Sequence, residues 1–348
     1  MRYFDYSFLK NEDIPSHITT LLLRINQMKI RDEYNFFMYN DVFTQLETIA
    51  KVQSIKASNA IEGIVTTDKR LKAILNQKQV PLNHAEQEIL GYSTLLEIIH
   101  NQYSTLSIKS KDILYFHRVL YTYYDFIGKG KFKTEDNAII SIQQGFRRIV
   151  FEPIPAYETE IAMEQMVLAY MDASNDSNIN KLLLIACYIV DFLCIHPYGD
   201  GNGRISRLLS LLLLYKNDYE IGKYISIENR IINHKESYYD SLEKSSKDWH
   251  TNQNDYWPFI EFFLLTLVDC YGKMEDRFSI VQNKKINKKD RIWQTLESSH
   301  IPLSKSDIYA IWPDISVNTI AEVLNKLVKS EKIYKIGKYK DAKYLKVN

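Results

Sequence analysis

The sequence predicts a mainly helical protein with one β-hairpin near its middle and a winged helix-turn-helix domain at its C-terminal end. Apolar residues recur with helical spacing through most of the chain, and two runs rich in β-branched and aromatic residues interrupt this spacing once. Beyond residue 283 the pattern changes to short elements. The 348 residues, of which 45% are apolar and 25% charged, are typical of a globular protein with two or three domains.

The helical spacing predicts a series of amphipathic or buried helices. They cover residues 18–30, 42–61, 84–102, 109–124, 158–171, 180–195, 204–216, 235–247 and 256–277. The interruption is the stretch NAIISIQQGFRRIVFEPIP, where two strand-like runs flank the letters QQG. We expect a hairpin over residues 137–151, which Pro153 and Pro155 prevent from extending further.

The C-terminal region begins with the polar, basic stretch FSIVQNKKINKKDR, which is typical of a linker. Short helices are predicted after it at residues 291–298, 305–311 and 317–330. Ser316 is a suitable N-cap for the third of these helices. An alternating stretch that turns at Lys340 and Asp341 then predicts a second hairpin. Three short helices followed by a hairpin form the outline of a winged helix-turn-helix.

Charge is distributed unevenly along the chain, although the net charge is only +1. Residues 284–348 contain 14 Lys and Arg against 7 Asp and Glu, which gives a net charge of +7. The rest of the chain therefore contains 30 against 36, which gives a net charge of −6. This asymmetry indicates a separate basic module at the C-terminus.

The cysteines and the apolar runs point to a cytoplasmic location. Cys187, Cys194 and Cys270 each stand alone in an apolar run, as expected of reduced core residues. The first residues contain no continuous apolar segment of a signal peptide, and the longest apolar run is too short to cross a bilayer. We therefore expect no association with a membrane.

The stretch HPYGDGNGRISR, residues 196–207, gives the strongest functional signal. Pro197 disfavours helical backbone at His196, so the preceding helix should end there and leave the imidazole free. Three glycines at alternate positions allow the backbone to turn tightly and to approach a ligand. We expect the next helix to begin near Asn202, with its first unpaired N–H groups forming an anion site.

Two arginines at the start of that helix oppose its dipole. Arg204 and Arg207 lie three residues apart and share a face, and each costs about 0.3–1 kcal/mol if it is exposed. A bound polyphosphate turns this cost into attraction. Asp200 can hold Mg²⁺ together with phosphate oxygens, and His196 can act as a base on an incoming hydroxyl. Each residue alone has a simpler structural explanation, but their combination within twelve residues favours a polyphosphate site with a general base.

The same stretch resembles the motif HPFx[D/E]GNGRxxR of the Fic family at every position except Tyr198, where the family usually has Phe. Fic proteins typically transfer AMP from ATP to a Ser, Thr or Tyr hydroxyl of a target protein. The resemblance implies that His196 deprotonates this hydroxyl and that Asp200 binds Mg²⁺. It further implies that the phosphates of ATP are held by Gly201, Asn202, Gly203, Arg204 and Arg207. The hydroxyl of Tyr198 needs a hydrogen-bond partner, and we expect activity to tolerate it.

The stretch SNAIEG, residues 58–63, places an anion at the unfavourable end of a helix. Gly63 is well suited to end the helix predicted from residue 42, so Glu62 lies at its negative end. A solvated Glu is one interpretation, and pairing with the two arginines is the other. The stretch also resembles the inhibitory motif [ST]xxxE[GN] of Fic proteins. That resemblance implies that Glu62 pairs with Arg207 and blocks the γ-phosphate of ATP, while Ser58 positions the helix.

Two further stretches resemble parts of Fic proteins. The hairpin at residues 137–151 resembles the Fic flap, which pairs with a target segment by strand addition; the alternative is a structural hairpin over the core. The stretch ENRIINHKESYYDSL resembles the region that contacts adenine, with Tyr239 and its neighbour Tyr238 as candidates and helix packing as the alternative. We divide the chain into a region with the inhibitory motif, a Fic core and a winged helix-like module, at residues 1–105, 106–282 and 283–348.

We therefore predict a Mg²⁺-dependent protein adenylyltransferase that uses ATP and is inhibited by its own Glu62. One alternative is the removal of AMP by the same site, and another is the use of a different nucleotide. A third is a DNA-binding regulator whose core only senses nucleotide, which His196 disfavours because a sensor needs no base. The partners that we expect are a target protein with a hydroxyl side chain, DNA or a protein at the basic module, and a second copy of the chain.

Overall fold

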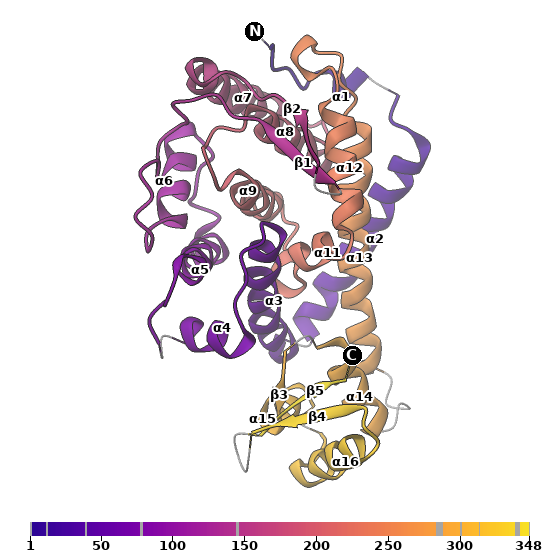
Figure 1. Cartoon of the computed structure of the whole chain (residues 1–348). Helices are drawn as coiled ribbons and strands as arrows, with labels where there is room; N and C mark the ends of the chain where they lie inside the picture. Colours follow the sequence, from indigo (N-terminus) through magenta and orange to yellow (C-terminus); the bar gives the residue numbers. More distant parts are fainter. Residues whose placement is uncertain are drawn as a thin grey trace. The chain divides into compact units, whose positions relative to one another are not determined.

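The structure is a computed structural model. It describes residues 2–11, 13–38, 40–76, 79–143, 146–282, 288–299, 301–312, 314–337 and 342–347. The fold is mainly helical (Figure 1), as the sequence predicts. It consists of two compact units, one of residues 1–29 and 50–271 and the other of residues 30–49 and 272–348. The predicted regions 1–105 and 106–282 thus contribute most of their residues to the same unit.

The larger unit is built from helices and one described hairpin. Its helices are α1 (Phe8–Asn11), α4 (Asp68–Leu75), α5 (His84–Gln102), α6 (Ser110–Leu120), α7 (Thr159–Ser174), α8 (Lys181–Ile195), α9 (Asn202–Lys216), α10 (Ile221–Tyr224), α11 (Ile227–Asn233) and α12 (Lys235–Ser246), with 3₁₀ turns at Ala156–Glu158 and Trp249–Thr251. Three helices have residues in both units: α2 (Ser16–Met38), α3 (Asn40–Ile61) and α13 (Trp257–Gln282).

The helices follow the predicted segments closely, with differences at their ends. The helix predicted at 84–102 is α5 with the same bounds. Part of the predicted linker is wrong, because α13 continues through Gln282. Neither Gly nor Pro occurs between Gly272 and the end of this helix, so nothing in the sequence interrupts its backbone hydrogen bonds. Residues 283–287 of the predicted linker lie outside the described residues.

Helix α8 lies at the centre of the larger unit. Every side chain from Leu182 to Ile195 is buried, and the helix packs against α7, α9 and α12 (Figure 1). A helix that is apolar on all sides has no face for solvent and must be surrounded by other elements. The residue that follows it, His196, is therefore attached to the most enclosed part of the fold.

One carboxylate, that of Asp191, is buried within α8. It accepts hydrogen bonds from the hydroxyls of Tyr6 at 2.8 Å and Tyr256 at 2.7 Å, and from the indole N–H of Trp249 at 2.6 Å. The Arg2 guanidinium lies 3.4 Å from the same carboxylate and 4.5 Å from the centre of the Trp249 rings. The N-terminal segment is thus fixed to the central helix by a buried ion pair.

Replacing Asp191 by Ala should lower the free energy of unfolding by about 3–5 kcal/mol, because Arg2 would remain buried without its anion. Urea unfolding followed by circular dichroism measures this change. The control is Asp125→Ala, since Asp125 is fully exposed in a surface pair with Lys129. We expect this control to stay within about 0.5 kcal/mol of the wild type. Equal stability of the two variants would contradict a stabilising role for the pair.

A hairpin forms where the sequence predicts one. Strands β1 (Ile139–Gln143) and β2 (Phe146–Phe151) pair antiparallel, with Gln143 opposite Phe146 and a shift in register between Ile139 and Ile140. The turn residues 144 and 145 lie outside the described residues. Strand β2 lies beside α12 (Figure 1), and Arg148 on the strand pairs with Glu243 on the helix.

The smaller unit contains a three-stranded sheet that the sequence predicts only in part. Its elements are α14 (Lys288–Ser298), β3 (Leu303–Ser304), α15 (Lys305–Ile311), α16 (Val317–Lys329), β4 (Ile333–Ile336) and β5 (Lys343–Lys346), with the strands in the order β3-β5-β4. The predicted hairpin is β4–β5, whose turn at Lys340 and Asp341 lies outside the described residues. Ser316 caps α16 by accepting a hydrogen bond from the N–H of Thr319, as predicted.

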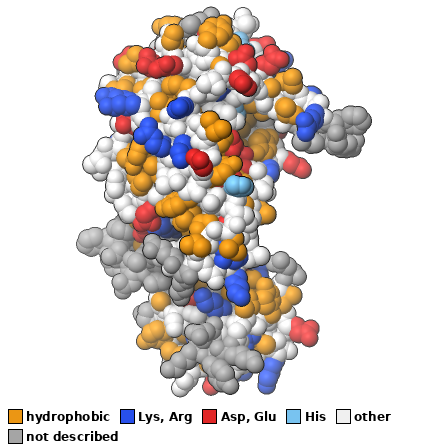
Figure 2. All heavy atoms as spheres, turned by 60° about the vertical axis from the view of Figure 1, so that its left-hand side comes forward, with side chains coloured by type: hydrophobic (Ala, Val, Ile, Leu, Met, Phe, Trp, Pro, Cys, Tyr) orange, Lys and Arg blue, Asp and Glu red, His pale blue; other side chains and the backbone are white. Residues whose placement is uncertain are grey.

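The distribution of surface charge and the burial of the cysteines can be compared with what the composition indicates. On the face shown in Figure 2, the basic and acidic side chains of the described residues lie interspersed. All three cysteines are buried, as expected. Among the helices that the structure describes, none combines the length and the apolar character that a bilayer span requires.

Candidate functional site

The site is built around the break between α8 and α9. Helix α8 ends at Ile195, and His196 follows with φ 50° and ψ 60°, in the left-handed region. A residue with a Cβ pays roughly 1–2 kcal/mol for this conformation. Pro197 explains why the helix cannot continue, and the predicted end at His196 is confirmed.

The imidazole of His196 is held in the form that a general base needs. Its Nδ1 lies 3.1 Å from the carbonyl oxygen of Leu193, so Nδ1 carries the proton and donates it to this acceptor. Nε2 then has a free lone pair. Burial lowers the pKa of His196 to about 4, against an ordinary value of 6.5. The side chain is therefore neutral at pH 7 and able to take up a proton.

Tyr198 anchors the loop in the core, and its extra hydroxyl finds the partner that it needs. The buried ring stacks on the imidazole of His117 with 3.9 Å between ring centres. The hydroxyl donates to the carbonyl oxygen of Ile113 at 3.1 Å. The Asn202 side chain closes the loop, because its Oδ1 accepts from the N–H of Tyr198 and its Nδ2 donates to the carbonyl oxygen of Tyr198.

His117, which the sequence analysis does not identify, holds the same loop through two hydrogen bonds to backbone groups. Its Nδ1 accepts from the N–H of Gly130 at 2.9 Å, and its Nε2 donates to the carbonyl oxygen of Asp200 at 3.1 Å. Burial lowers the pKa of His117 to about 4. The ring is thus a neutral bridge between two backbone segments. The sequence offers no signal for it, since a lone His in a helix is common.

The first turn of α9 offers backbone N–H groups to an anion. Its N-cap is Gly201 with φ 84°, and no described side chain caps the turn. Gly203 lies in this turn, and a Cβ built on it would lie only 2.3 Å from Oε1 of Glu62. A carboxylate therefore lies against the helix start, and a larger residue at position 203 would displace it from this place.

Asp200 and Arg204 are connected through a tyrosine. The Tyr121 hydroxyl donates to Oδ2 of Asp200 at 2.6 Å and accepts from Arg204 at 2.7 Å. The Arg204 guanidinium also pairs with Glu88 at 2.6 Å and is only 1% exposed. In this arrangement Arg204 fixes Asp200, while a direct contact with phosphate stays a prediction. Tyr121 and Glu88 are further residues that the sequence analysis does not identify.

The end of α3 has the geometry that its glycine predicts. Gly63, with φ 79°, donates its N–H to the carbonyl oxygen of Ala60, and the N–H of Ile64 bonds to that of Asn59 at 2.9 Å. These two bonds form a Schellman motif, which places Glu62 at the last, negative end of the helix.

Arg207 donates hydrogen bonds to the last residues of this helix and to Glu62. Its Nε donates to Oγ of Ser58 at 2.9 Å, and one terminal nitrogen donates to the Ser58 carbonyl oxygen at 2.9 Å and to Oε1 of Glu62 at 2.8 Å. Burial acts to lower the pKa of Arg207, but Glu62 raises it above the ordinary value. A second cation, Lys235, donates to the carbonyl oxygen of Ile61 at 2.8 Å. The structure thus places Glu62 against Arg207, as predicted.

Comparison with known proteins identifies the fold around this site. Residues 107–214, which include α6 to α8 and most of α9, match the sequence model of the Fic/DOC family. The chain contains a Fic domain. Over 267 residues the chain is 26% identical to the protein adenylyltransferase Fic of Culex quinquefasciatus, and over 244 residues it is 26% identical to that of Drosophila melanogaster.

These alignments cover 74% and 69% of this chain, and the chain spans only 45% and 44% of the two relatives. A solved Fic family protein from Desulfovibrio desulfuricans G20 is similar in fold, with a TM-score of 0.62, 20% identity and 97% of each chain covered. A segment of Fic-1 from C. elegans gives a TM-score of 0.59 at 19% identity, with 76% of this chain and 73% of that chain covered.

The Fic domain offers one carboxylate to a magnesium ion. The Asp200 side chain is 61% exposed. Its Oδ2 accepts from Tyr121 at 2.6 Å and from Arg204 at 3.4 Å, while its Oδ1 accepts one hydrogen bond, from the N–H of Gly201, which leaves a lone pair available on Oδ1. Among the described residues there is no group of three or more potential metal ligands. The site therefore fits a Mg²⁺ ion that takes one ligand from Asp200 and the others from nucleotide phosphates and water.

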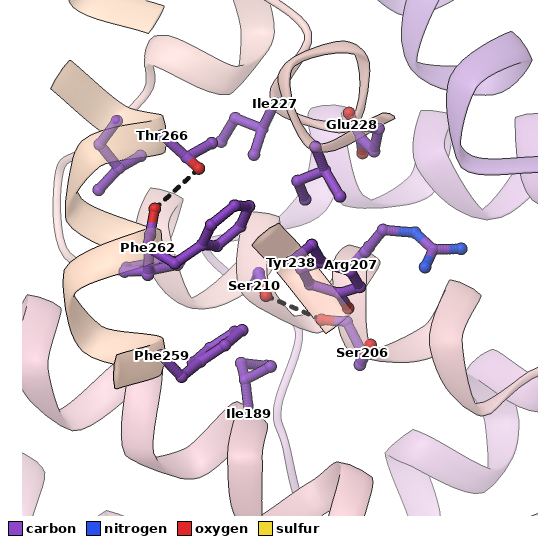
Figure 3. Close-up of a pocket in the computed structure, with 13 residues that line it drawn as sticks. Ile189, Ser206, Arg207, Ser210, Ile227, Glu228, Tyr238, Phe259, Phe262 and Thr266 are labelled. Atoms are coloured by element: carbon purple, nitrogen blue, oxygen red, sulfur yellow. Dashed lines mark hydrogen bonds between the residues drawn. The ribbon is translucent and has the colours of Figure 1, made fainter. Parts of the chain in front are cut away.

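The two tyrosines near the Fic site differ in their surroundings. Tyr238 is buried and lines a small pocket with Phe259 and Phe262, and Arg207 lines the same pocket (Figure 3). Tyr239 is 43% exposed, and the ammonium of Lys235 lies 5.8 Å from its ring centre. Tyr238 is thus packed between helices, and Tyr239 is the one of the pair with an exposed surface. A contact of Tyr239 with adenine stays a prediction.

Proposed function

We propose that this chain transfers AMP from ATP to a hydroxyl of a target protein and that Glu62 restrains the reaction. One observation carries the proposal: the Glu62 carboxylate lies against Arg207 and Gly203 at the start of α9. A carboxylate in this place uses the arginine and the helix dipole that a phosphate would use. The relatives named protein adenylyltransferase support the same reaction, as do the positions of His196 and Asp200 in one loop.

In the proposed reaction, the target hydroxyl oxygen bonds to the α-phosphorus of ATP, and the bond from that phosphorus to the pyrophosphate oxygen breaks. Nε2 of His196 takes the hydroxyl proton. Arg207 and the N–H groups of α9 stabilise the negative charge of the phosphates. A Mg²⁺ ion bound at Asp200 would neutralise phosphate charge. The role of β1–β2 as a flap for the target segment, and that of Tyr239 at the adenine, are parts of this proposal.

The transfer rate of an uninhibited variant should stay constant between pH 5 and 8 and fall below about pH 4. The reason is that burial holds the pKa of His196 at about 4, so the base stays neutral well below the ordinary value of 6.5. The measurement is kcat/KM for ATP against pH in the Glu62→Gly protein. A midpoint near pH 6.5 would show that the base is not the buried imidazole described above.

The proposal is tested by incubating the purified Glu62→Gly protein with ATP, Mg²⁺ and candidate target proteins. Intact mass should show a covalent AMP adduct, with pyrophosphate released in equal amount. Loss of AMP from a target that already carries it would favour the reverse reaction, with Glu62 orienting a water. Measurable ATP binding without any adduct would favour another nucleotide donor or a nucleotide-sensing regulator.

For the C-terminal unit we propose a docking role on DNA or on a protein. Three helices and a sheet follow the order of a winged helix-turn-helix, and α16 presents an exposed face with Asn318, Asn325, Lys326 and Lys329. The test is whether the full chain retards a DNA duplex in a gel. Retardation that weakens with salt and is lost in the Lys326→Glu, Lys329→Glu double variant would favour DNA. Assembly with a second copy and a cytoplasmic location stay predictions.

A further inference from the structure

A buried lysine, Lys133, lies beside the loop of residues 196–207, outside that stretch but within the residues 107–214 that match the Fic/DOC family model. Lys133 is only 7% exposed, and burial lowers the pKa of its ammonium to about 8. The ammonium donates to Oδ1 of Asn137 at 2.8 Å and to the carbonyl oxygen of Ile195 at 3.1 Å. The ammonium of a lysine has three hydrogen-bond donors and normally lies in solvent. A buried lysine must therefore find acceptors within the protein, as Lys133 does here.

Lys133 holds the loop at two points. Besides the contact of its ammonium with the last residue of α8, its backbone N–H donates to the carbonyl oxygen of Pro197 at 2.8 Å. The last carbonyls of a helix have no partners within the helix and must find them elsewhere. Lys133 therefore supplies donors to the residues immediately before and after His196.

Asn137 donates hydrogen bonds to two further carbonyl oxygens of the same loop. Its Nδ2 lies 3.3 Å from the carbonyl oxygen of His196 and 3.0 Å from that of Tyr198. Together, Lys133 and Asn137 thus bind the four consecutive carbonyls from residue 195 to residue 198. They are joined to each other by the bond from the ammonium to Oδ1 of Asn137.

This set of bonds fixes the backbone on which the base depends. His196 is in the left-handed region, where a residue with a Cβ stays only if its surroundings determine the backbone. The carbonyls on both sides of it, and its own, are bound by Lys133 and Asn137. Movement of any of these carbonyls would turn the imidazole and displace Nε2.

The same segment is attached to the hairpin. Oδ1 of Asp136 accepts from the N–H of Ala156 at 2.7 Å, and this bond joins the chain before β1 to the chain after β2. Asn137 lies two residues before the first residue of β1. One short segment, residues 133–137, therefore connects the base of the hairpin to the loop that carries His196.

We propose that Lys133 and Asn137 are positioning residues, which hold the carbonyls of residues 195–198 so that His196 keeps its left-handed backbone and its imidazole keeps its place. The kinetic part of this inference rests on the proposed transfer reaction, and the structural part does not. Neither residue contacts the reacting atoms in this assignment. Both act through the backbone of the catalytic loop.

Lys133 also belongs to the charged groups around the imidazole. Burial and the Lys133 ammonium lower the pKa of His196, whereas Glu62 and Asp200 raise it. Asp136 is the charged neighbour of Lys133 and raises the pKa of the lysine. Removing the ammonium should therefore raise the pKa of His196 above about 4, in addition to displacing the ring.

The first test follows the Cε1–H signals of the histidines by NMR over a pH series in the full chain, with the His196 signal assigned by its loss in His196→Gln. In Lys133→Met we expect the His196 signal to move and its pKa to rise. In Asn137→Ala we expect the signal to move as well. Lys131→Met is the matched control, because Lys131 is an exposed lysine two residues away. A His196 signal and pKa identical in all four proteins would overturn the proposal.

The second test measures transfer kinetics in the Glu62→Gly background. Lys133→Met should lower kcat by at least about tenfold with the KM for ATP changed less than about threefold, since a misplaced base affects the chemical step. Lys133→Arg, which keeps a cation and its donors, should recover most of kcat. An equal loss of ATP affinity and of thermal stability, with kcat unchanged, would overturn the proposal in favour of a merely structural role.

The two tests separate this inference from the proposed reaction. If the Glu62→Gly protein transfers no AMP at all, the proposed function fails, and the NMR series still decides whether Lys133 and Asn137 hold His196. If transfer is present and the His196 signal is unaffected by Lys133→Met, the positioning role fails and the proposed function stands.

Discussion

Replacing Glu62 by Gly is expected to raise the rate of AMP transfer by about 10- to 150-fold. The change removes a hydrogen bond between charged groups, worth about 1.5–3 kcal/mol, which corresponds to this factor in rate if the pair must break before ATP is seated. Arg207 then becomes available to a phosphate, and the space beside Gly203 opens. The measurement is the initial rate of adduct formation at saturating ATP and Mg²⁺ for variant and wild type.

Two further variants make this result specific. Glu62→Gln keeps the length of the side chain without its charge, and it should give an intermediate rate. Glu236→Gln changes an exposed glutamate on α12 and should leave the rate of the wild type unchanged. If Glu62→Gly and wild type transfer AMP equally fast, the contact with Arg207 does not restrain the enzyme.

Replacing His196 by Ala is expected to lower the transfer rate by about 10²–10⁴-fold, because a general base contributes about this much. ATP binding should stay within a few-fold of its original value, since the phosphates are expected at Arg207 and at the start of α9. Both quantities are measured in the Glu62→Gly background, the first by adduct formation and the second by calorimetry. His17→Ala is the control, because His17 is an exposed histidine that lies beside Glu261 on the surface.

Retained transfer in the His196→Ala protein would mean that another group or water takes the proton. A parallel loss of ATP binding would instead indicate that the loop has lost its shape. The two results are distinguishable because binding and chemistry are measured separately.

Local features of the sequence predict the elements that form the site. Pro197 predicts the end of α8, the glycine-containing stretch after it predicts the start of α9 near Asn202, and Gly63 predicts the end of α3. These predictions succeed because a helix end depends on the backbone preferences of a few adjacent residues. The short helices α1, α4, α10 and α11 and the strand β3 are missed, because elements of this length leave little periodicity in the sequence.

The sequence by itself determined the mainly helical fold, the loop of residues 196–207 and the unfavourable charges of Glu62 and the arginines. The resemblance to the inhibitory motif already implied that Glu62 pairs with Arg207, but only the tertiary structure showed that Arg204 is buried beside Glu88. The reason is that the two arginines are equivalent in spacing, and their partners come from different helices far away in the chain. The sequence also offered no indication of the distant residues that support the loop, since contacts between distant residues leave no local pattern. These residues are His117, Tyr121, Lys133 and Asn137.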